Sequence, residues 1–467
     1  MTVVSYELEP ELSKDARVVA GDPAARARDT LLLGELAESG RRRRLYVDIS
    51  GEQVVAIFGK RGTGKSFTLG VVLEGLAAAK GETALSTKVT PRAALVLDIM
   101  DIFWTSTIAL APTGPPELVK QHAIMKQAGY TPIDLSVDLW IPAGFENPST
   151  DPAGVGSLVI SASDMGLDDW GALFGIDIYT EPRGMLIHEL IHSVSITGYA
   201  DASGTTHPPK SDYSISDLLA CCENNNTLLA NFQDGTARSV RQRLLTFSVL
   251  PLFQGTSTPL SAILRPFRTS VLMLARVPDG LKNVVVAVLT RRIMRERRDA
   301  SHAQKRLDLQ ANLSVEEKNK LQNVVNGSIP RTWVLMDEAH VLASSDAPPA
   351  VRESLIKFAK EGRNYGLSLC IATQQPSAID PKLMSQVETL LVHQLTAPRD
   401  AQIAQEMIRS PLPSSLKING EPASVSALIR QLSPGTAIFS SGNAPNLPRC
   451  CVVKVRPRVT AHGGYEA

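Results

Sequence analysis

A glycine-rich loop constrains the fold of this 467-residue chain more than any other stretch. Its sequence is Gly59-Lys60-Arg61-Gly62-Thr63-Gly64-Lys65-Ser66, and it lies between the apolar runs 54–58 and 68–73. The pattern predicts a strand, a tight turn and a helix. The spacing fits G-x-x-x-x-G-K-[ST], in which glycines let backbone N–H groups turn inward around a small anion. The loop therefore predicts a binding site for nucleotide phosphates.

Each polar side chain of the loop has a predicted role. Lys65 would reach the β- and γ-phosphates of a triphosphate, and the Ser66 hydroxyl would be a ligand of Mg²⁺. We therefore expect ATP and Mg²⁺ as the bound groups. The residues expected to contact the nucleotide are Gly59, Arg61, Gly62, Thr63, Gly64, Lys65, Ser66 and Phe67.

A second apolar run, residues 332–336, ends in two adjacent carboxylates, Asp337 and Glu338. The run predicts a buried strand that delivers both groups to the edge where the loop lies. Asp337 would hold the Mg²⁺ through water, and Glu338 would orient and deprotonate an attacking water. A glutamate in this place favours hydrolysis over transfer of phosphate to another substrate.

Three more residues are candidates for the site. Gln374 follows Thr373 at the tip of the predicted strand 367–373 and would sense the γ-phosphate. Arg363, beside a glycine turn, would act as an arginine finger on a neighbour's nucleotide, or else form an ion pair at a helix end. Asp98 ends the apolar run 93–97 and is either a site residue or a turn cap.

Composition sets limits on partners and location. Lys plus Arg number 48 and Asp plus Glu number 47, so the net charge of +1 predicts only local contacts with nucleic acid. The basic runs 41–44 and 291–298 are candidates for such contacts, with structural support as the alternative. The five cysteines form neither a disulfide framework nor a C-x-x-C pattern, and no apolar stretch would span a bilayer. We expect a cytoplasmic protein.

The rest of the chain predicts less. Residues 31–36 are expected to form a helix within a polar N-terminal region, and residues 282–298 a long one, followed by a surface excursion over 300–330. The segment His188-Glu189-Leu190-Ile191-His192 fits the zinc-binding pattern H-E-x-x-H. No convincing third ligand follows it, and ordinary helix packing is the preferred interpretation.

Four segments together resemble the HerA branch of the HerA/FtsK ATPases, over residues 45–457. The resemblance implies an α/β fold with a RecA-like P-loop NTPase core over residues 46–110 and 267–457. It also implies a mainly helical insertion over 111–266. A tail, 458–467, follows the core, and the short N-terminal region, residues 1–45, is expected to be a reduced barrel or a contact with another subunit or a partner. The segments are 58–66, 335–340, 361–367 and 372–381.

The resemblance also implies an assembly and a mechanism. Family members form hexameric rings that bind ATP between subunits and draw double-stranded DNA through a central channel. By matching position, Lys65 and Ser66 would bind phosphate and Mg²⁺, Asp337 and Glu338 would drive hydrolysis, and Arg363 would act across the interface. Gln374 would sense the γ-phosphate. The chain departs from many relatives in lacking a full N-terminal β-barrel and in carrying Gln375 where they have arginine.

Three functions follow as hypotheses. The first is a hexameric motor that translocates DNA, with a nuclease or other effector protein, in DNA end processing or phage defence. The second is an ATP-dependent ring scaffold that assembles and regulates an effector enzyme. The third is a coupling ATPase for conjugation or secretion.

Overall fold

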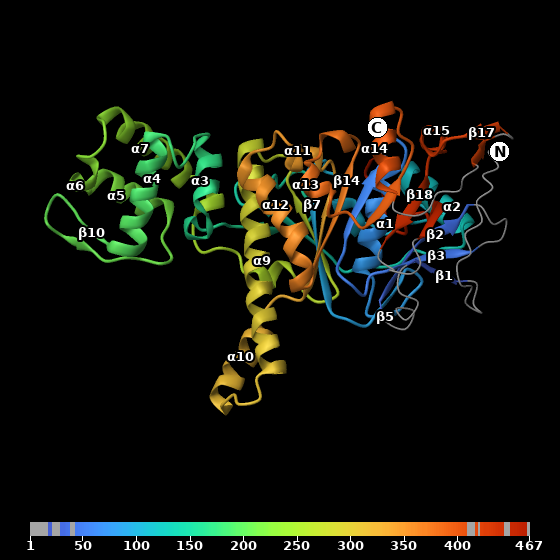
Figure 1. The fold of residues 1–467 in the computed structure, drawn as a ribbon, viewed down its shortest axis with the longest axis horizontal. Helices are drawn as coiled ribbons and strands as arrows, with labels where there is room; N and C mark the ends of the chain where they lie inside the picture. Colours follow the sequence, from blue (N-terminus) through green and yellow to red (C-terminus); the bar gives the residue numbers. More distant parts are fainter. Residues whose placement is uncertain are drawn as a thin grey trace.

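One large mixed sheet runs through the chain (Figure 1). The computed structural model describes residues 17–20, 29–37, 43–408, 416–418, 421–442 and 449–464. Among these residues the strand order is β1-β3-β2-β19-β18-β15-β4-β14-β13-β7-β12-β8-β9. No helix among them combines the length and apolar character that a membrane crossing needs.

The central strands are parallel and buried on both faces, so their carboxyl ends meet at one edge. β14 lies between β4, which leads into the glycine-rich loop, and β13, which carries the carboxylates. The two motifs are thus two strand spacings apart, roughly 10 Å. The predicted α/β fold is confirmed. The strands are β15 (Thr389–Val392), β4 (Val54–Phe58), β14 (Leu367–Thr373), β13 (Arg331–Met336), β7 (Arg92–Asp98), β12 (Thr269–Met273), β8 (Val137–Pro142) and β9 (Gly156–Leu158).

Antiparallel strands extend the sheet beyond β15. The predicted hairpin near the C-terminus is confirmed as β18 (Thr436–Ser441) and β19 (Arg449–Val455). The helix predicted over residues 31–36 is wrong: Thr30–Leu36 is strand β2, paired with β19 and with β3 (Arg44–Asp48). The described N-terminal strands thus extend the core sheet. The remaining strands here are β1 (Arg17–Ala20), β5 (Gly81–Glu82) and β6 (Ser86–Lys88).

Helices cover both faces of the sheet. α1 (Lys65–Ala77) begins inside the glycine-rich loop and is buried on nearly all sides, within one apolar cluster. α9 (Asp279–Leu309) and α12 (Pro349–Glu361) pack together in the cluster on the opposite face. The other core elements are α2 (Pro116–Gln127), α11 (His340–Ala343), α13 (Pro381–Met384), α14 (Pro398–Met407), α15 (Val425–Gln431), and the small hairpin β16 (Leu416–Ile418) and β17 (Glu421–Ala423).

A helical lobe lies to one side of the sheet, at the left of Figure 1. It falls within the insertion predicted over 111–266, but α2, β8 and β9 from that range belong to the core. The division of the chain into core and insertion stays a prediction. The lobe consists of α3 (Leu167–Phe174), α4 (Pro182–His192), α5 (Ile215–Asn224), α6 (Asn226–Leu229), α7 (Asp234–Ser248), α8 (Leu260–Ile263) and the hairpin β10 (Tyr199–Ala200) and β11 (Thr206–His207).

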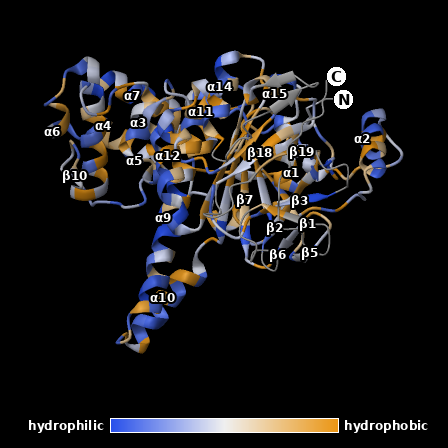
Figure 2. Cartoon of the chain, turned by 45° about the vertical axis from the view of Figure 1, so that its right-hand side comes forward, coloured by the Kyte–Doolittle hydropathy of each residue, from blue (hydrophilic) through white to orange (hydrophobic). Residues whose placement is uncertain are grey.

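A helical hairpin projects from the body of the molecule (Figures 1 and 2). α9 continues to Leu309, past the predicted end at residue 298, and α10 (Val315–Gly327) folds back along it. α10 has no buried residue, and Figure 2 shows the hairpin as largely hydrophilic where the sheet is apolar. The predicted surface excursion over residues 300–330 is confirmed.

The chain returns across α1 after β19. Glu74 of α1 is fully buried. Its carboxylate forms ion pairs with Arg456 Nη1 at 2.6 Å and with Arg458 Nε at 3.3 Å. The backbone N–H groups of Val459 and Thr460 donate to the same carboxylate, each at 3.0 Å. A single acidic side chain thus fixes residues 456–460 against the helix that begins at the glycine-rich loop.

Candidate active site

The glycine-rich loop adopts the predicted strand–turn–helix geometry. Gly62 and Gly64 have φ of +78° and +113°, a region that favours glycine. A Cβ on Gly59 would lie 2.8 Å from His393 Cβ and 2.9 Å from Thr63 Oγ1, so no larger residue fits there. Because α1 starts at Lys65, the loop's N–H groups gather at a helix N-terminus, which favours an anion.

The loop lysine lies against both predicted carboxylates. Lys65 Nζ is 2.5 Å from Asp337 Oδ1, 2.8 Å from Glu338 Oε1 and 3.3 Å from Ser66 Oγ. Lys65, Asp337 and Glu338 are all buried. The structure therefore brings together four predicted site residues from two segments about 270 positions apart.

The carboxylates of Asp337 and Glu338 could bind a cation. Asp337 Oδ1 accepts from Lys65 and from the backbone N–H of Glu338, the latter at 2.8 Å. Asp337 Oδ2 is buried and has no hydrogen-bond partner among the described residues. This unpartnered carboxylate oxygen and the Ser66 hydroxyl, which lies 3.3 Å from the same Lys65 Nζ that contacts Asp337, are oxygen donors of the kind that Mg²⁺ prefers. Ser66 and Asp337 therefore fit the metal role predicted for them.

Glu338 is held in an unusual backbone conformation, with φ +47°. Such a conformation is costly for a residue with a Cβ and tends to occur at functional sites. Glu338 Oε2 lies 3.3 Å from His340 Nδ1, and that nitrogen is also 3.3 Å from Thr373 Oγ1. Burial lowers the pKa of His340, which favours the neutral ring beside the carboxylate. His340 was not among the predicted site residues, although it follows the acidic pair directly.

A second histidine, His393, packs against the glycine-rich loop and the start of α1. His393 follows β15 and is fully buried. Its Nδ1 donates to the carbonyl of Thr436 at 3.0 Å, so its Nε2 accepts from the Thr68 hydroxyl at 2.8 Å. Burial lowers the pKa of His393 to about 4. Sequence reasoning missed this residue because its contacts with the loop and with β18 are long-range.

The tip of β14 lies beside the loop. The N–H of Gly59 donates to the carbonyl of Thr373 at 3.2 Å, and Thr373 Oγ1 accepts from the N–H of Gln375 at 3.0 Å. Gln374, which lies between Thr373 and Gln375 in the sequence, is partly exposed at the same sheet edge. Its position is compatible with the predicted sensing role, which stays a prediction.

Arg363 lies outside this buried cluster. It sits in the short helix η6 (Gly362–Tyr365) with a 63% exposed side chain, and its guanidinium pairs with Glu388. Within one chain, the ion-pair alternative is therefore the one observed. The exposed guanidinium is also open to contact with another subunit, and the finger role stays a prediction.

Asp98 acts as a turn cap. Its carboxylate accepts N–H bonds from Met100, Ile102 and Phe103 at 3.3, 3.2 and 2.8 Å. Burial raises its pKa to about 6. Of the two roles considered for this residue, the structure shows the capping one.

The remaining loop residues differ in exposure. Arg61 is exposed at the loop tip, whereas Thr63 is buried and donates from Oγ1 to the carbonyl of Lys60 at 2.8 Å. Phe67 is partly buried at the start of α1, and its ring meets His462 edge-on at 5.3 Å between centroids.

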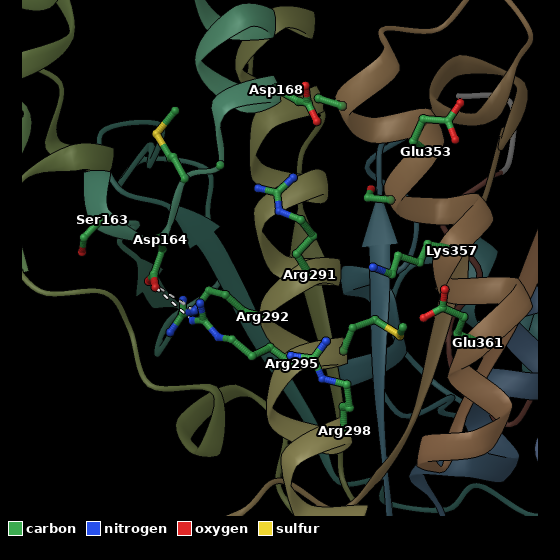
Figure 3. Close-up of a pocket in the computed structure, with 15 residues that line it drawn as sticks. Ser163, Asp164, Asp168, Arg291, Arg292, Arg295, Arg298, Glu353, Lys357 and Glu361 are labelled. Carbon is green, nitrogen blue, oxygen red and sulfur yellow. Dashed lines mark hydrogen bonds and ion pairs between the residues drawn. The ribbon is translucent and has the colours of Figure 1, made fainter. Parts of the chain in front are cut away.

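The basic window of α9 lines a cavity of about 470 Å³ between α9, α12 and residues 163–168 (Figure 3). Figure 3 shows Arg292 and Arg295 turned toward Asp164, each at 3.3 Å. Arg291 forms a further ion pair with Asp169. These three arginines thus join α9 to the start of the helical lobe, which is the structural alternative considered for this window.

The H-E-x-x-H segment lies on α4 in the lobe. His188, Glu189 and His192 are all exposed. In the described part of the chain, no group of three or more His, Cys, Asp or Glu side chains is arranged to hold a metal ion. The geometry offers no support for a zinc site there.

Comparison with known proteins gives partial matches. No protein-family model matches the chain. It is 24% identical over 150 residues to the DNA double-strand break repair helicase HerA of Pyrococcus furiosus, covering 31% of the chain and 27% of that protein. It is 30% identical over 94 residues to HerA of Sulfurisphaera tokodaii, and the match covers 20% of the chain and 19% of that protein. A probable helicase of Methanocaldococcus jannaschii is 26% identical over 199 residues, and the match covers 43% of the chain and 32% of that helicase. The matches thus span less than a third of each relative.

Solved structures resemble the chain over most of its length. VirB4 of Thermoanaerobacter pseudethanolicus has a TM-score of 0.49 at 14% identity and covers 91% of the chain and 96% of its own. The plasmid coupling protein TrwB with ADP and Mg²⁺ has a TM-score of 0.47 at 14% identity. The match covers 94% of the chain and 96% of TrwB. The chain is thus similar in sequence to HerA helicases over part of its length, and the segments around Lys65, Asp337 and Glu338 have the geometry of a P-loop site.

Proposed function

We propose that the chain is a Mg²⁺-dependent ATPase that works as a motor on double-stranded DNA. The observation that carries the proposal is the buried contact of Lys65 with Asp337 and Glu338. It joins a phosphate-binding loop to a metal-binding carboxylate and a water-activating one, the parts that ATP hydrolysis requires.

In the proposed reaction, Lys65 exchanges its two carboxylate partners for the β- and γ-phosphates of ATP. Ser66 and Asp337 would hold Mg²⁺, which when bound neutralises charge on the phosphates. Glu338, freed from Lys65, takes a proton from the attacking water. His340 Nδ1 lies 3.3 Å from the other oxygen of Glu338 and would stay beside that carboxylate during the exchange.

The proposal includes a ring of identical subunits, with six as the number implied by the HerA resemblance. Support comes from Arg363, whose exposed side chain could complete a neighbour's site. Duplex DNA would pass through the ring, and a nuclease or other effector would act with it in DNA end processing or phage defence. The chain's net charge of +1 is compatible with this, since a ring needs few basic side chains per subunit in its channel.

The test is ATP turnover with and without added duplex DNA. We expect DNA to raise the turnover of the wild-type protein, and Lys65→Ala to abolish both basal and stimulated turnover. Asp279→Ala, at the exposed start of α9, is the control for a surface change. Turnover that stays flat across duplexes of different length would overturn the motor proposal.

A second candidate is an ATP-dependent scaffold for an effector enzyme. It is favoured by the projecting hairpin of α9 and α10, near whose tip Leu309 and Val315 are 82% and 76% exposed. In this candidate function, the two side chains would form part of the surface that contacts the effector. An effector whose activity in the complex survives Glu338→Gln would favour the scaffold over the motor.

A further inference from the structure

The cavity between α9, α12 and residues 163–168 has no part in the proposed ATPase reaction. Its volume of about 470 Å³ is in the range of small-molecule binding sites. Met165, Met294 and Ala350, all buried, form the apolar part of its wall. The residues around Lys65 that form the candidate active site do not line it. A ligand in this cavity would therefore bind apart from the glycine-rich loop.

The cavity wall carries cationic side chains from two helices. Arg291, Arg295 and Arg298 lie on one face of α9, at spacings of four and three residues. Arg292 is next to this face, and Figure 3 shows Lys357 extending from α12 toward α9. Five cations from two helices thus surround one small space.

The protein neutralises these cations only in part. Arg292 and Arg295 share the single carboxylate of Asp164. Arg292 Nη1 is buried without a hydrogen-bond partner, and Lys357 Nζ has no ion-pair partner, among the residues that the structure describes. A buried donor without an acceptor is unfavourable, so an anionic acceptor from a ligand would stabilise this wall.

Carboxylates in the same wall limit the kind of anion. The five cations face four carboxylates, namely Asp164, Asp168, Glu353 and Glu361. A polyanion such as nucleic acid would be repelled by these groups, whereas a molecule with one phosphate could donate hydroxyl hydrogen bonds to them. A phosphate monoester carries about −1.5 to −2 charges near pH 7, which suits several cations at once. The wall thus matches a single phosphate group on a small body that bears hydroxyl groups.

We propose that this cavity binds a small phosphate monoester, with the phosphate between Arg295, Arg298 and Lys357 and hydroxyl groups toward Glu353 and Glu361. Residues 163–168 lead from the core into α3 of the helical lobe. A ligand held between them and the two core helices would connect the lobe to the core. The inference goes beyond the proposed function and does not depend on the role of the glycine-rich loop.

The experiment measures binding of ribose 5-phosphate by calorimetry, with ribose and inorganic phosphate as comparison ligands. The variants are Lys357→Ala and Arg298→Ala, with Lys360→Ala as the matched control. Lys360 is exposed on α12, three residues after Lys357, and does not line the cavity. The wild-type protein is also measured with an excess of ADP and Mg²⁺, to occupy the glycine-rich loop. Thermal unfolding of each variant verifies that it is folded.

We expect ribose 5-phosphate to bind the wild-type protein equally with and without ADP, and more tightly than ribose or inorganic phosphate. Lys357→Ala and Arg298→Ala should each weaken this binding about tenfold, the scale of one lost charge-assisted hydrogen bond, whereas Lys360→Ala should bind like the wild type. The proposal is overturned if ribose 5-phosphate does not bind, if ADP displaces it, or if Lys357→Ala and Lys360→Ala have equal effects. Failure of the ATPase proposal would leave these results unchanged, so the two outcomes are distinguishable.

Discussion

Lys65 Nζ lies 2.5 Å from Asp337 Oδ1, and both side chains are buried. With Glu338 at 2.8 Å from the same nitrogen, one cation faces two carboxylates. Removing the cation would leave like charges in a site with little water. Breaking a buried ion pair by deleting one partner typically costs about 3–5 kcal/mol.

We therefore predict that Lys65→Met lowers the free energy of unfolding by about 3 kcal/mol or more without nucleotide. Adding Asp337→Asn to this variant should restore most of the loss, because one of the two carboxylates is neutralised in place. Urea unfolding of the two variants and the wild type measures both effects. Equal stability of the single and double variants would contradict the charge argument, whereas ATP turnover should be absent from both.

Much of this site could be predicted from sequence because its motifs are local. The loop glycines and Lys65 occur within eight residues, and Asp337 and Glu338 directly follow the apolar residues 333–336 of β13. Their meeting follows from a general property of parallel sheets, whose strands end at one edge. The supporting residue His393 has no such local signal, since its partners Thr68 and Thr436 are far away in sequence.

Strand β2, where the sequence predicts a helix, shows a second limit of prediction from sequence. Residues 31–36 are a short apolar run, for which periodicity does not separate helix from strand. The hydrogen bonds of β2 to β19 and β3 decide the matter, and no local pattern reveals them. In the same way, the predicted helix ended at residue 298 because the residues that follow are mostly polar, although α9 continues through 299–309 without Gly or Pro and buries Ala300 and Ala303.

His393 makes stability depend on pH. Burial lowers its pKa from an ordinary 6.5 to about 4, so between these values the unfolded chain binds a proton that the folded chain does not. Stability is therefore complete above pH 6.5 and falls as the pH decreases through this window. From pH 6.5 to pH 5 the loss from this residue is about 2 kcal/mol.

We predict that His393→Gln removes this part of the pH dependence. Glutamine offers a donor and an acceptor but does not titrate, so the difference in unfolding free energy between pH 7 and pH 5 should shrink by about 2 kcal/mol. Urea unfolding at the two pH values measures it. His188→Gln, at an exposed position on α4, should retain the wild-type difference. An unchanged difference in His393→Gln would contradict the assignment.

The buried carboxylate of Glu74 gives a prediction about the C-terminal segment. Burial alone would raise its pKa, but Arg456 and Arg458 more than reverse this, so the pKa is lowered and the group is charged in the folded state. Glu74→Gln would leave two buried guanidinium groups without their counter-ion. We expect a loss of about 3–5 kcal/mol in unfolding free energy.

Hydrogen exchange provides a second measurement on Glu74→Gln. Amides of residues 459 and 460, which donate to the carboxylate, should lose protection more than those of β4. The control is Glu223→Gln, which breaks the exposed pair of Glu223 with Arg241 and should change stability by less than about 1 kcal/mol. Similar effects of the two changes would mean that the buried network contributes little.

The last prediction separates the two roles of Arg363. If it completes a neighbour's site, Arg363→Ala lowers ATP turnover by about 10³-fold or more, whereas Glu388→Gln, which breaks the same ion pair, leaves turnover within about twofold. Mixing subunits gives the sharper measurement. Lys65→Ala subunits retain Arg363 and Arg363→Ala subunits retain the loop, so mixed assemblies should regain turnover that neither variant has alone. Mixtures as inactive as their components, or equal losses in Arg363→Ala and Glu388→Gln, would assign Arg363 to the ion pair.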